Sequence, residues 1–359
     1  MREKEIQSIF DQFEHKFNFQ SYSELISGHI NDTFLILTDA NEHYVLQCIN
    51  HNVFKNVPGL ISNKVTVSNH LLNKLNYLSP KEIGKKVLCF IKAKSSENFY
   101  YTDGINYWNL MPYIEEGKTH EVVTNSEIAY EGGKLMGEFL NLTSDLDNSK
   151  LVEVIPKFHD MSFRFQQYKL ALQSARVDRL KKAELYINWV SKLRDEMQIL
   201  QNLKEIGKIR IRVTHNDTKI SNMLFDEKNI GMCVLDTDTV MPGIVHYDFG
   251  DAIRTICNTA TEDEIDLSKV EFNLEFYKSY VRGFLEKTGE TLTPIEIEYL
   301  PLAAKTMIFI IGLRFLTDYL NNDVYFKTKY SEHNLDRTKN QFKLIYSLEQ
   351  KYNEMEINL

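Results

Sequence analysis

The feature that most constrains this chain is a short strand-and-loop island, residues 209–238, which interrupts a segment of helical pattern. It contains His215, Asp217 and Asn222 in the order His-x-Asp-x-x-x-x-Asn, then an apolar strand followed by Asp236 and Asp238. Turns rich in Asp and Asn are common, but this ordered pattern is much rarer. Phosphoryl transfer requires such a set, because one carboxylate orients the attacking hydroxyl and oxygen ligands hold Mg²⁺ against the phosphates. The sequence therefore predicts phosphoryl-transfer chemistry on these loops.

The rest of the pattern predicts an α+β chain with its strands first. Strands are predicted at 22–27, 32–39, 43–50 and 87–93, and a hairpin at 97–111 turns on Asp103-Gly104. A helix is predicted from Pro58 to about Leu75. Later helices are predicted at 126–142, 162–173, 178–202, 264–287, 294–320 and 335–356. We therefore expect an N-terminal lobe over 1–115 and a mostly helical C-terminal lobe over 116–359.

Composition narrows the partners and the location. The 359 residues carry a net charge of −8, so the chain lacks the basic surface that nucleic acids require, although a local site can still bind phosphate. The four widely spaced cysteines, in apolar stretches, are typical of reduced core thiols. The N-terminus shows no signal-peptide core, and the most apolar run, 306–313, is far shorter than a membrane span. We expect a soluble cytoplasmic protein with neither nucleic-acid nor membrane partners.

The island also carries a family resemblance. HNDTKISN followed by VLDTDT resembles the catalytic and metal-binding loops of aminoglycoside phosphotransferases and choline kinases. LDTDTVMPG, YDFGDAIR, GHIND near the N-terminus and RFLTDYL with DVYF near the C-terminus resemble the N-acetylhexosamine 1-kinases. The resemblance implies a two-lobed protein-kinase-like fold with an antiparallel sheet in the N-lobe, ATP as co-substrate and Mg²⁺ as cofactor. It also implies phosphorylation of N-acetylglucosamine or N-acetylgalactosamine at the anomeric C1 hydroxyl.

The resemblance assigns roles within the island. It implies that Asp217 is the catalytic base, which also touches the substrate, and that Asn222 and Asp236 are the metal ligands. His215 is expected to support the loop by hydrogen bonding, as a satisfied core histidine would. Asp238 is left with two alternatives, a contact to a second metal ion or a turn cap.

On the nucleotide side, the resemblance places adenine against a hinge formed by Met111, Tyr113 and Glu115, and the phosphates beside Gly28. Protein kinases carry a lysine on the third strand, paired with a glutamate from a helix. Here the strand has Gln47, and the helix after Pro58 contains no Glu. We therefore expect Mg²⁺ and backbone N–H groups to neutralise more of the phosphate charge.

On the sugar side, the resemblance points to His29, Arg314 and Tyr325. Arg314 and Asp318 lie one helical turn apart, and Asp318 is expected to offer an acceptor beside the arginine fork. A surface ion pair between these two side chains is the alternative. Where the family has an aromatic residue after the arginine of the DAIR segment, this chain has Thr255.

Two other motifs look like metal or phosphate sites but are not assigned that role. Asp248-Phe249-Gly250 spells a kinase metal tripeptide, but it lies too far beyond Asn222, and the resemblance gives the metal position to Asp236. Asp248 resembles instead a structural aspartate that braces the catalytic loop. Gly117-Lys118-Thr119 lacks the upstream glycine of a phosphate-binding loop.

Two alternatives to an N-acetylhexosamine kinase are left open. The first is a related kinase acting on an amino alcohol, homoserine or an aminoglycoside, and the second is a nucleotide-binding pseudokinase scaffold.

Overall fold

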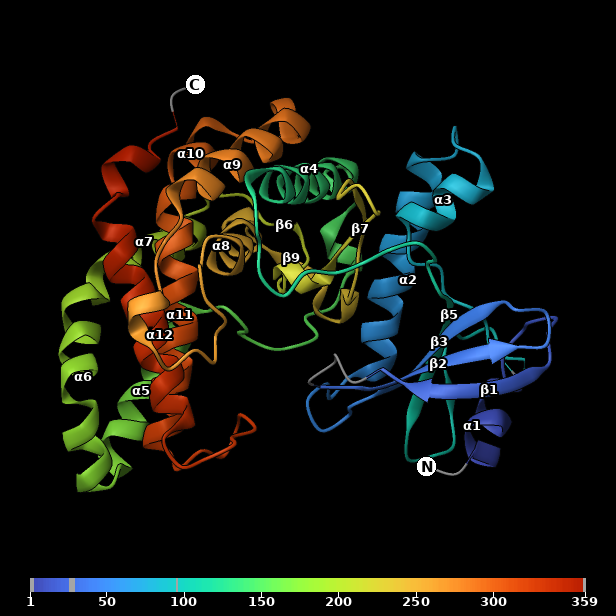
Figure 1. Ribbon diagram of the computed structural model, residues 1–359, viewed down its shortest axis with the longest axis horizontal. Coiled ribbons are helices and arrows are strands. Elements are labelled where there is room, and N and C mark those ends of the chain that lie inside the picture. Colours follow the sequence, from blue (N-terminus) through green and yellow to red (C-terminus); the bar gives the residue numbers. More distant parts are fainter. Residues whose placement is uncertain (1–2, 26–29, 95, 358–359) are drawn as a thin grey trace.

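The computed structural model describes residues 3–25, 30–94 and 96–357 and shows a sheet-based part beside a helical part (Figure 1). In Figure 1 the blue-to-cyan N-terminal segment forms the sheet, and the green-to-red remainder forms the helical part. Helix α2 (Val57–Lys74) lies between them. This mixed architecture confirms the predicted fold class. The last sheet strand ends at Pro112 and the next helix begins at Ser126, and the division between residues 115 and 116 stays a prediction.

In the described chain the main sheet has five antiparallel strands in the order β1-β2-β3-β5-β4. They are β1 (Phe19–Glu24), β2 (Asp32–Thr38), β3 (His43–Ile49), β4 (Tyr101–Thr102) and β5 (Tyr107–Pro112). Alternate residues of β2 and β3 point to one buried face, where Phe34 lies opposite Leu46. Helix α1 (Glu3–Phe10) covers this face with Ile6 and Phe10.

The helices that accompany the sheet have clear start signals. The Asn56 side chain caps α2 by accepting the Gly59 backbone N–H at 3.0 Å, and Pro58 occupies the first turn. Helix α3 (Pro80–Lys86) begins with a capping box between Ser79 and Glu82. The helix predicted from Pro58 is therefore confirmed.

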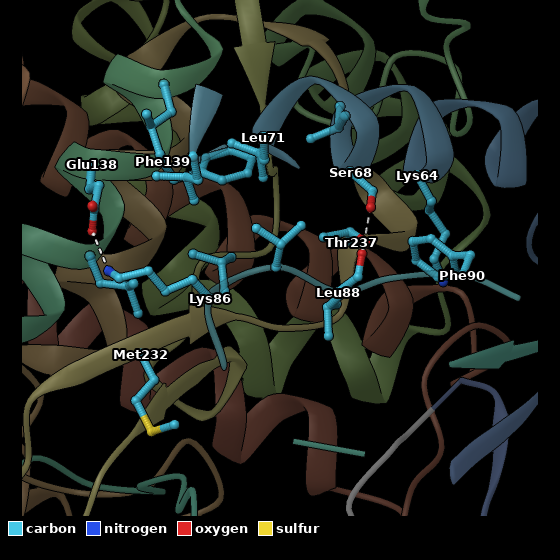
Figure 2. A pocket seen from close by; sticks show the side chains of 16 residues that line it. Lys64, Ser68, Leu71, Lys86, Leu88, Phe90, Glu138, Phe139, Met232 and Thr237 are labelled. Atoms are coloured by element: carbon cyan, nitrogen blue, oxygen red, sulfur yellow. Dashed lines mark hydrogen bonds and ion pairs between the residues drawn. The ribbon is translucent and has the colours of Figure 1, made fainter. Parts of the chain in front are cut away.

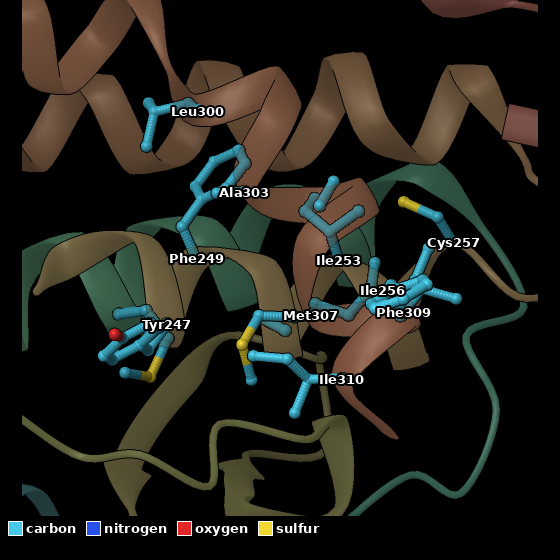
Figure 3. Close-up of a cluster of buried hydrophobic side chains, with 14 of the residues drawn as sticks. Tyr247, Phe249, Ile253, Ile256, Cys257, Leu300, Ala303, Met307, Phe309 and Ile310 are labelled. Carbon is cyan, nitrogen blue, oxygen red and sulfur yellow. The ribbon is translucent and has the colours of Figure 1, made fainter. Parts of the chain in front are cut away.

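The helical part is built around α11, which packs against α8, α5 and α12. Figure 3 shows the buried contact between α8 and α11, where Phe249 and Ile253 meet Ala303 and Met307. The helices are α4 (Ser126–Thr143), α5 (Met161–Ser174), α6 (Val177–Met197), α7 (Ile199–Glu205), α8 (Val245–Ile256), α9 (Leu274–Thr288), α10 (Pro294–Glu298), α11 (Leu300–Leu320) and α12 (His333–Glu349).

Helix α11 is apolar over a longer stretch than the run at residues 306–313 that stands out in the sequence. By length and composition its 21 residues could cross a membrane, but 89% of its most apolar window is buried inside the fold. Its neighbours are other helices of the same chain, so α11 has the surroundings of a core helix.

Two predicted elements were wrong, and helices α3 and α8 were not predicted. Residues 87–93 form no strand, because their backbone bonds are divided between β5, through Ile91 N–H to Leu110 O at 2.9 Å, and the segment around Phe13. Helix α8 was missed although Val245, Phe249, Ile253 and Ile256 recur at helical spacing, and nearly all of the helix is buried, polar residues included. The helix expected from residue 264 begins at Leu274, where the Asn273 side chain caps it.

Candidate active site

Four short strands bring the polar loops together. β6 (Arg212–Thr214) pairs with β9 (Met241–Gly243), and β7 (Met223–Phe225) pairs with β8 (Gly231–Val234). The end of β6 lies opposite the start of β9, and the start of β7 lies opposite the end of β8. The loop from β6 to β7 therefore emerges beside the loop from β8 to β9. This pairing explains why residues 20 positions apart in the sequence form one site.

Asp217 presents one carboxylate oxygen that the protein leaves open. Its Oδ2 accepts the Nδ2–H of Asn222 at 3.1 Å and lies 3.4 Å from Lys219 Nζ. Its Oδ1 has no hydrogen-bond partner in the described ranges. Burial is the largest single effect and raises the pKa of this carboxyl, but several neighbouring groups, Lys219 first among them, together hold the pKa below its usual value. Asp217 is therefore an ionised acceptor at neutral pH.

His215 and Asp248 fix the loop that carries Asp217. The backbone N–H groups of His215 and Asn216 donate to the two carboxylate oxygens of Asp248 at 2.8 and 2.7 Å. The His215 ring accepts the Asp217 backbone N–H at Nδ1 and donates from Nε2 to Leu235 O at 2.7 Å. These bonds confirm the bracing role predicted for Asp248 and the loop-supporting role predicted for His215.

Asn222 and Asp236 offer oxygen atoms that the protein leaves available. Asn222 uses its Nδ2 on the backbone and side chain of Asp217, so its Oδ1 stays uncommitted. Asp236 has a left-handed backbone with φ of 54°, and in the described chain its carboxylate receives no hydrogen bond. Burial, followed by the nearby carboxylates of Asp238 and Asp217, raises the pKa of Asp236 to about 7. Crowded carboxylates of this kind favour a bound cation.

The donor set fits Mg²⁺ held jointly by protein and nucleotide. No cluster of three or more His, Cys, Asp or Glu side chains within the described ranges is arranged to hold a metal ion alone. Mg²⁺ commonly uses one or two protein carboxylates and completes its shell with water and substrate phosphates. Asp236 and Asn222 supply two protein ligands and leave the other positions to phosphate oxygens and water, so they match that mode of binding.

Sequence reasoning missed two cations at this site. Lys219 follows Asp217 by two residues, and Asp217 raises the pKa of this lysine to about 12. The buried guanidinium of Arg254 pairs with Asp251 at 2.9 Å and with Glu262 at 2.6 Å. The position of Lys219 inside the catalytic motif was a usable signal. Arg254 was noted only as part of the DAIR segment, and its ion pairs were not foreseen because its helix was not predicted.

Asp238 and Thr255 both make contacts that the sequence did not foresee. Asp238 is buried in an ion pair with Lys64 of α2, so it is neither free nor a simple turn cap. Thr255 accepts the backbone N–H of Ile220 at 3.0 Å and so supports the end of the catalytic loop.

The predicted hinge forms the crossing between the two parts of the molecule. Met111 is buried in β5, and the Tyr113 N–H bonds to His43 O at 3.0 Å. The Glu115 carboxylate lies 2.7 Å from His43 Nδ1. The backbone N–H groups of residues 114–117 have no partner in the described chain and are available to a nucleotide base. Gly28 and His29 lie outside the described residues.

Arg314 and Tyr325 line a cavity of about 350 Å³, a size typical of small-molecule sites. The Arg314 guanidinium lies over the rings of Phe158, Tyr325 and Phe326 at 5.2–5.6 Å, and its Nη2 is 3.4 Å from the Tyr325 hydroxyl. Arg164 lines the same cavity; burial, then the charge of Arg314, lowers its pKa to about 9. Two guanidinium groups and the single carboxylate of Asp318 line this cavity, which leaves it with an excess of positive charge.

Asp318 is engaged by the protein itself. Its carboxylate accepts the backbone N–H groups of Val324, Tyr325 and Phe326 at 2.8–3.0 Å and the Asn334 side chain at 2.9 Å. In the described chain no carboxylate lies within ion-pair distance of Arg314, so the surface pair considered as an alternative is not formed. Asp318 instead shapes the loop that carries Tyr325.

The cavity lies next to the catalytic loop without including Asp217. Arg314 packs on Phe158, and the adjacent His159 donates from Nε2 to Asn216 O at 3.0 Å. Burial lowers the pKa of His159 to about 3, so this linking residue stays neutral. One layer of side chains therefore joins the cavity to the predicted base.

Comparison with known proteins places this geometry in a wider group. A model described as the phosphotransferase enzyme family matches residues 21–284. A solved aminopropanol kinase is 15% identical, with a TM-score of 0.61 and 99% of each chain covered. An aminoglycoside phosphotransferase from Alicyclobacillus acidocaldarius is 10% identical, with a TM-score of 0.60 and coverage of 97% and 96%. An ethanolamine kinase from Plasmodium vivax is 14% identical, with a TM-score of 0.56 and coverage of 93% and 84%. At these identities the three structures show a shared fold.

Proposed function

We propose that this chain, which belongs to the phosphotransferase enzyme family, transfers the γ-phosphoryl group of ATP to the anomeric C1 hydroxyl of an N-acetylhexosamine in the cytoplasm. The observation that carries the sugar assignment is the positive cavity formed by Arg314 and Arg164 beside the catalytic loop. The resemblance of the LDTDTVMPG and C-terminal segments to N-acetylhexosamine 1-kinases supports the same substrate.

The open oxygen of Asp217 defines the chemical step. Asp217 Oδ1 accepts the proton of the C1 hydroxyl while the sugar oxygen forms its bond to the γ-phosphorus and the bond from that phosphorus to the β-γ bridging oxygen breaks, releasing ADP. Asn222 and Lys219 hold the other carboxylate oxygen and so fix the direction of Oδ1. Bound at Asn222 and Asp236, Mg²⁺ would neutralise phosphate charge as it develops. The C1–O bond is never broken, so the configuration of the bound anomer is retained, α by family resemblance.

The character of the cavity favours a neutral acceptor over a cationic one. A site for a protonated amine needs a carboxylate within reach, but Asp318 is saturated by four donors. Arg314 and Arg164 would repel an ammonium group, whereas the N–H groups of Arg314 can donate to sugar hydroxyl or N-acetyl oxygens. Arg164 contributes its charge, since its guanidinium already donates to Phe158 O and Gln167 Oε1. Tyr325 adds a half-exposed ring at the rim of the cavity. These features weigh against choline, ethanolamine and aminoglycoside acceptors.

The pseudokinase alternative is disfavoured by the completeness of the catalytic loop. Asp217, Asn222 and Asp236 are all present, and the hydrogen bonds of Asp248 hold the loop in a defined position. A scaffold that only binds nucleotide has no need of an open, ionised acceptor oxygen.

The variant Arg314→Ala tests the substrate class. If Arg314 donates to a neutral sugar, its loss should lower kcat/KM for N-acetylglucosamine by about 10- to 150-fold, or 1.5–3 kcal/mol, with the KM for ATP almost unchanged. The matched control is Arg176→Ala, since Arg176 is 65% exposed and pairs only with nearby Asp178. Unchanged sugar kinetics would remove Arg314 from the site, and improved turnover of choline in the variant would indicate a cationic substrate.

A further inference from the structure

Helix α2 carries a buried lysine that points at the metal-binding loop. The side chain of Lys64 is 2% exposed and forms an ion pair with Asp238, whose side chain is 3% exposed. Figure 2 shows Lys64 descending from α2 beside Phe90, near Thr237 of the metal-binding loop. The ammonium lies 5.2 Å from the centre of the Phe90 ring. A lysine so thoroughly removed from water needs a reason, because burial of a charge is costly without compensating partners.

The same lysine lies where the expected strand lysine is missing. Lys64 Nζ donates to Gln47 Oε1 at 3.3 Å, and Asn109 Nδ2 donates to the same oxygen at 3.4 Å. Gln47 is paired across the sheet with Thr33 on one side and Asn109 on the other, so the position of its amide is fixed. Protein kinases place a strand lysine and a helix glutamate at this junction. Here the strand supplies the neutral group and the helix supplies the cation.

Asp238 is the carboxylate partner of this lysine, as the helix glutamate is the partner of the strand lysine in protein kinases. Besides Lys64, its carboxylate accepts the side-chain N–H of Asn31, whose own Oδ1 accepts the Asn50 backbone N–H at 2.9 Å. These contacts join the sheet, α2 and the metal-binding loop. Asp238 follows Asp236 by two residues on the same loop. Lys64 is therefore close to the ligand expected to hold Mg²⁺ and the phosphates.

We propose that Lys64 contacts the non-transferred phosphates of ATP and that Asp238 is the positioning residue that holds its ammonium group there. The inference rests on the proposed kinase function and extends it, because it names the cation that replaces the absent strand lysine. Compared with the protein-kinase arrangement, the cation is on α2 instead of β3, and its carboxylate partner is on the metal-binding loop instead of α2.

Nucleotide binding separates this role from a purely structural ion pair. Affinities for ADP and adenosine are measured by calorimetry in the presence of Mg²⁺, and thermal unfolding is followed without nucleotide. The variant Lys64→Met should weaken ADP binding by about 10- to 150-fold, the range for hydrogen bonds from a charged group, and leave adenosine binding within about twofold. The control Lys74→Met removes a lysine from the same helix that pairs with Asp145 at the surface. It should change neither affinity.

Two double variants sharpen the test. Lys64→Met/Asp238→Asn removes both charges and should recover much of the thermal stability lost in Lys64→Met, because no buried charge is left unpaired. It should not recover ADP affinity. Gln47→Lys/Lys64→Met returns the cation to the strand and should regain part of that affinity.

The outcomes distinguish the inference from the function beneath it. If Lys64→Met binds ADP like wild type, or if removing both charges restores ADP affinity together with stability, Lys64 is structural and the inference is overturned. If wild type binds no ADP in the presence of Mg²⁺, the proposed function fails and the inference fails with it.

Discussion

The close approach of α8 to α11 should be sensitive to a single methyl group. A Cβ added at Gly250 would lie 2.3 Å from the backbone oxygen of Ala303 and 2.6 Å from Cγ of Met307. Contacts under 3.0 Å are essentially never seen, so the two helices must separate by at least 0.7 Å at this point. Overpacking of this kind costs about 1–3 kcal/mol of the free energy of unfolding, and the obstacle here is backbone, which cannot rotate away.

The displacement should also reach catalysis. Asp248 precedes Gly250 by two residues on α8 and binds the backbone of the loop that carries Asp217. Misplacement of a catalytic group by about 1 Å can cost about 10²-fold in rate, so kcat of Gly250→Ala should fall by at least tenfold. Urea unfolding and steady-state kinetics measure the two effects. The control Gly84→Ala adds a Cβ that meets nothing within 4 Å and should stabilise α3 slightly. If Gly250→Ala matched Gly84→Ala in both assays, the packing argument would be refuted.

Three further perturbations test the site and its surroundings. Asp217→Asn should keep ATP and sugar affinities in calorimetry but lower kcat by about 10²–10⁴-fold, because it removes the proton acceptor and preserves the shape; a kcat within a fewfold of wild type would rule out the base assignment. Asp236→Ala should raise the Mg²⁺ concentration required for activity, whereas Asp248→Ala should chiefly lower stability in denaturant titrations, and the opposite pattern would reverse the two assignments. Burial lowers the pKa of His246 to about 4, while its Nε2–H donates to Glu296 O at 3.0 Å. On acidification the unfolded chain protonates this imidazole near pH 6.5, and the folded chain does so only near pH 4, so the free energy of unfolding should decrease as the pH falls through that window. The variant His246→Gln should remove about 3 kcal/mol of the stability loss between pH 7 and pH 4 in urea titrations. An unchanged slope would contradict the burial of a neutral imidazole.

The catalytic loops were predictable because their chemistry is local in sequence. His215, Asp217 and Asn222 lie within eight residues, so their spacing indicated one loop with phosphoryl-transfer chemistry, and the family resemblance supplied the separate roles. The bracing role of Asp248 also came from that resemblance. The start of α2 was predictable because a proline and an asparagine cap leave a local signal.

The missed residues depend on contacts between distant segments. Lys64 was overlooked because the helix was searched for a glutamate, and its ion pair with Asp238 becomes visible only when α2 packs against the metal-binding loop. Arg164 comes to the cavity from α5, 150 positions before Arg314, and nothing in its own neighbourhood indicates a site. Asp318 was expected beside Arg314 from its helical spacing, but three backbone N–H groups of the following loop and the side chain of Asn334 occupy its acceptor positions. Spacing predicts which side chains share a helix face, but it does not predict which of them will be hydrogen-bonded by other segments of the chain.

The most direct test of the account is an acceptor panel with the purified wild-type protein, ATP and Mg²⁺. The release of ADP should be fast with N-acetylglucosamine or N-acetylgalactosamine and weak with choline, ethanolamine, homoserine and an aminoglycoside. NMR of the product should show phosphorus coupled to the anomeric proton of the sugar, as expected for a sugar 1-phosphate of retained configuration. Fast turnover of a cationic acceptor with neither sugar phosphorylated, or phosphorus on any sugar oxygen other than that of C1, would contradict the account.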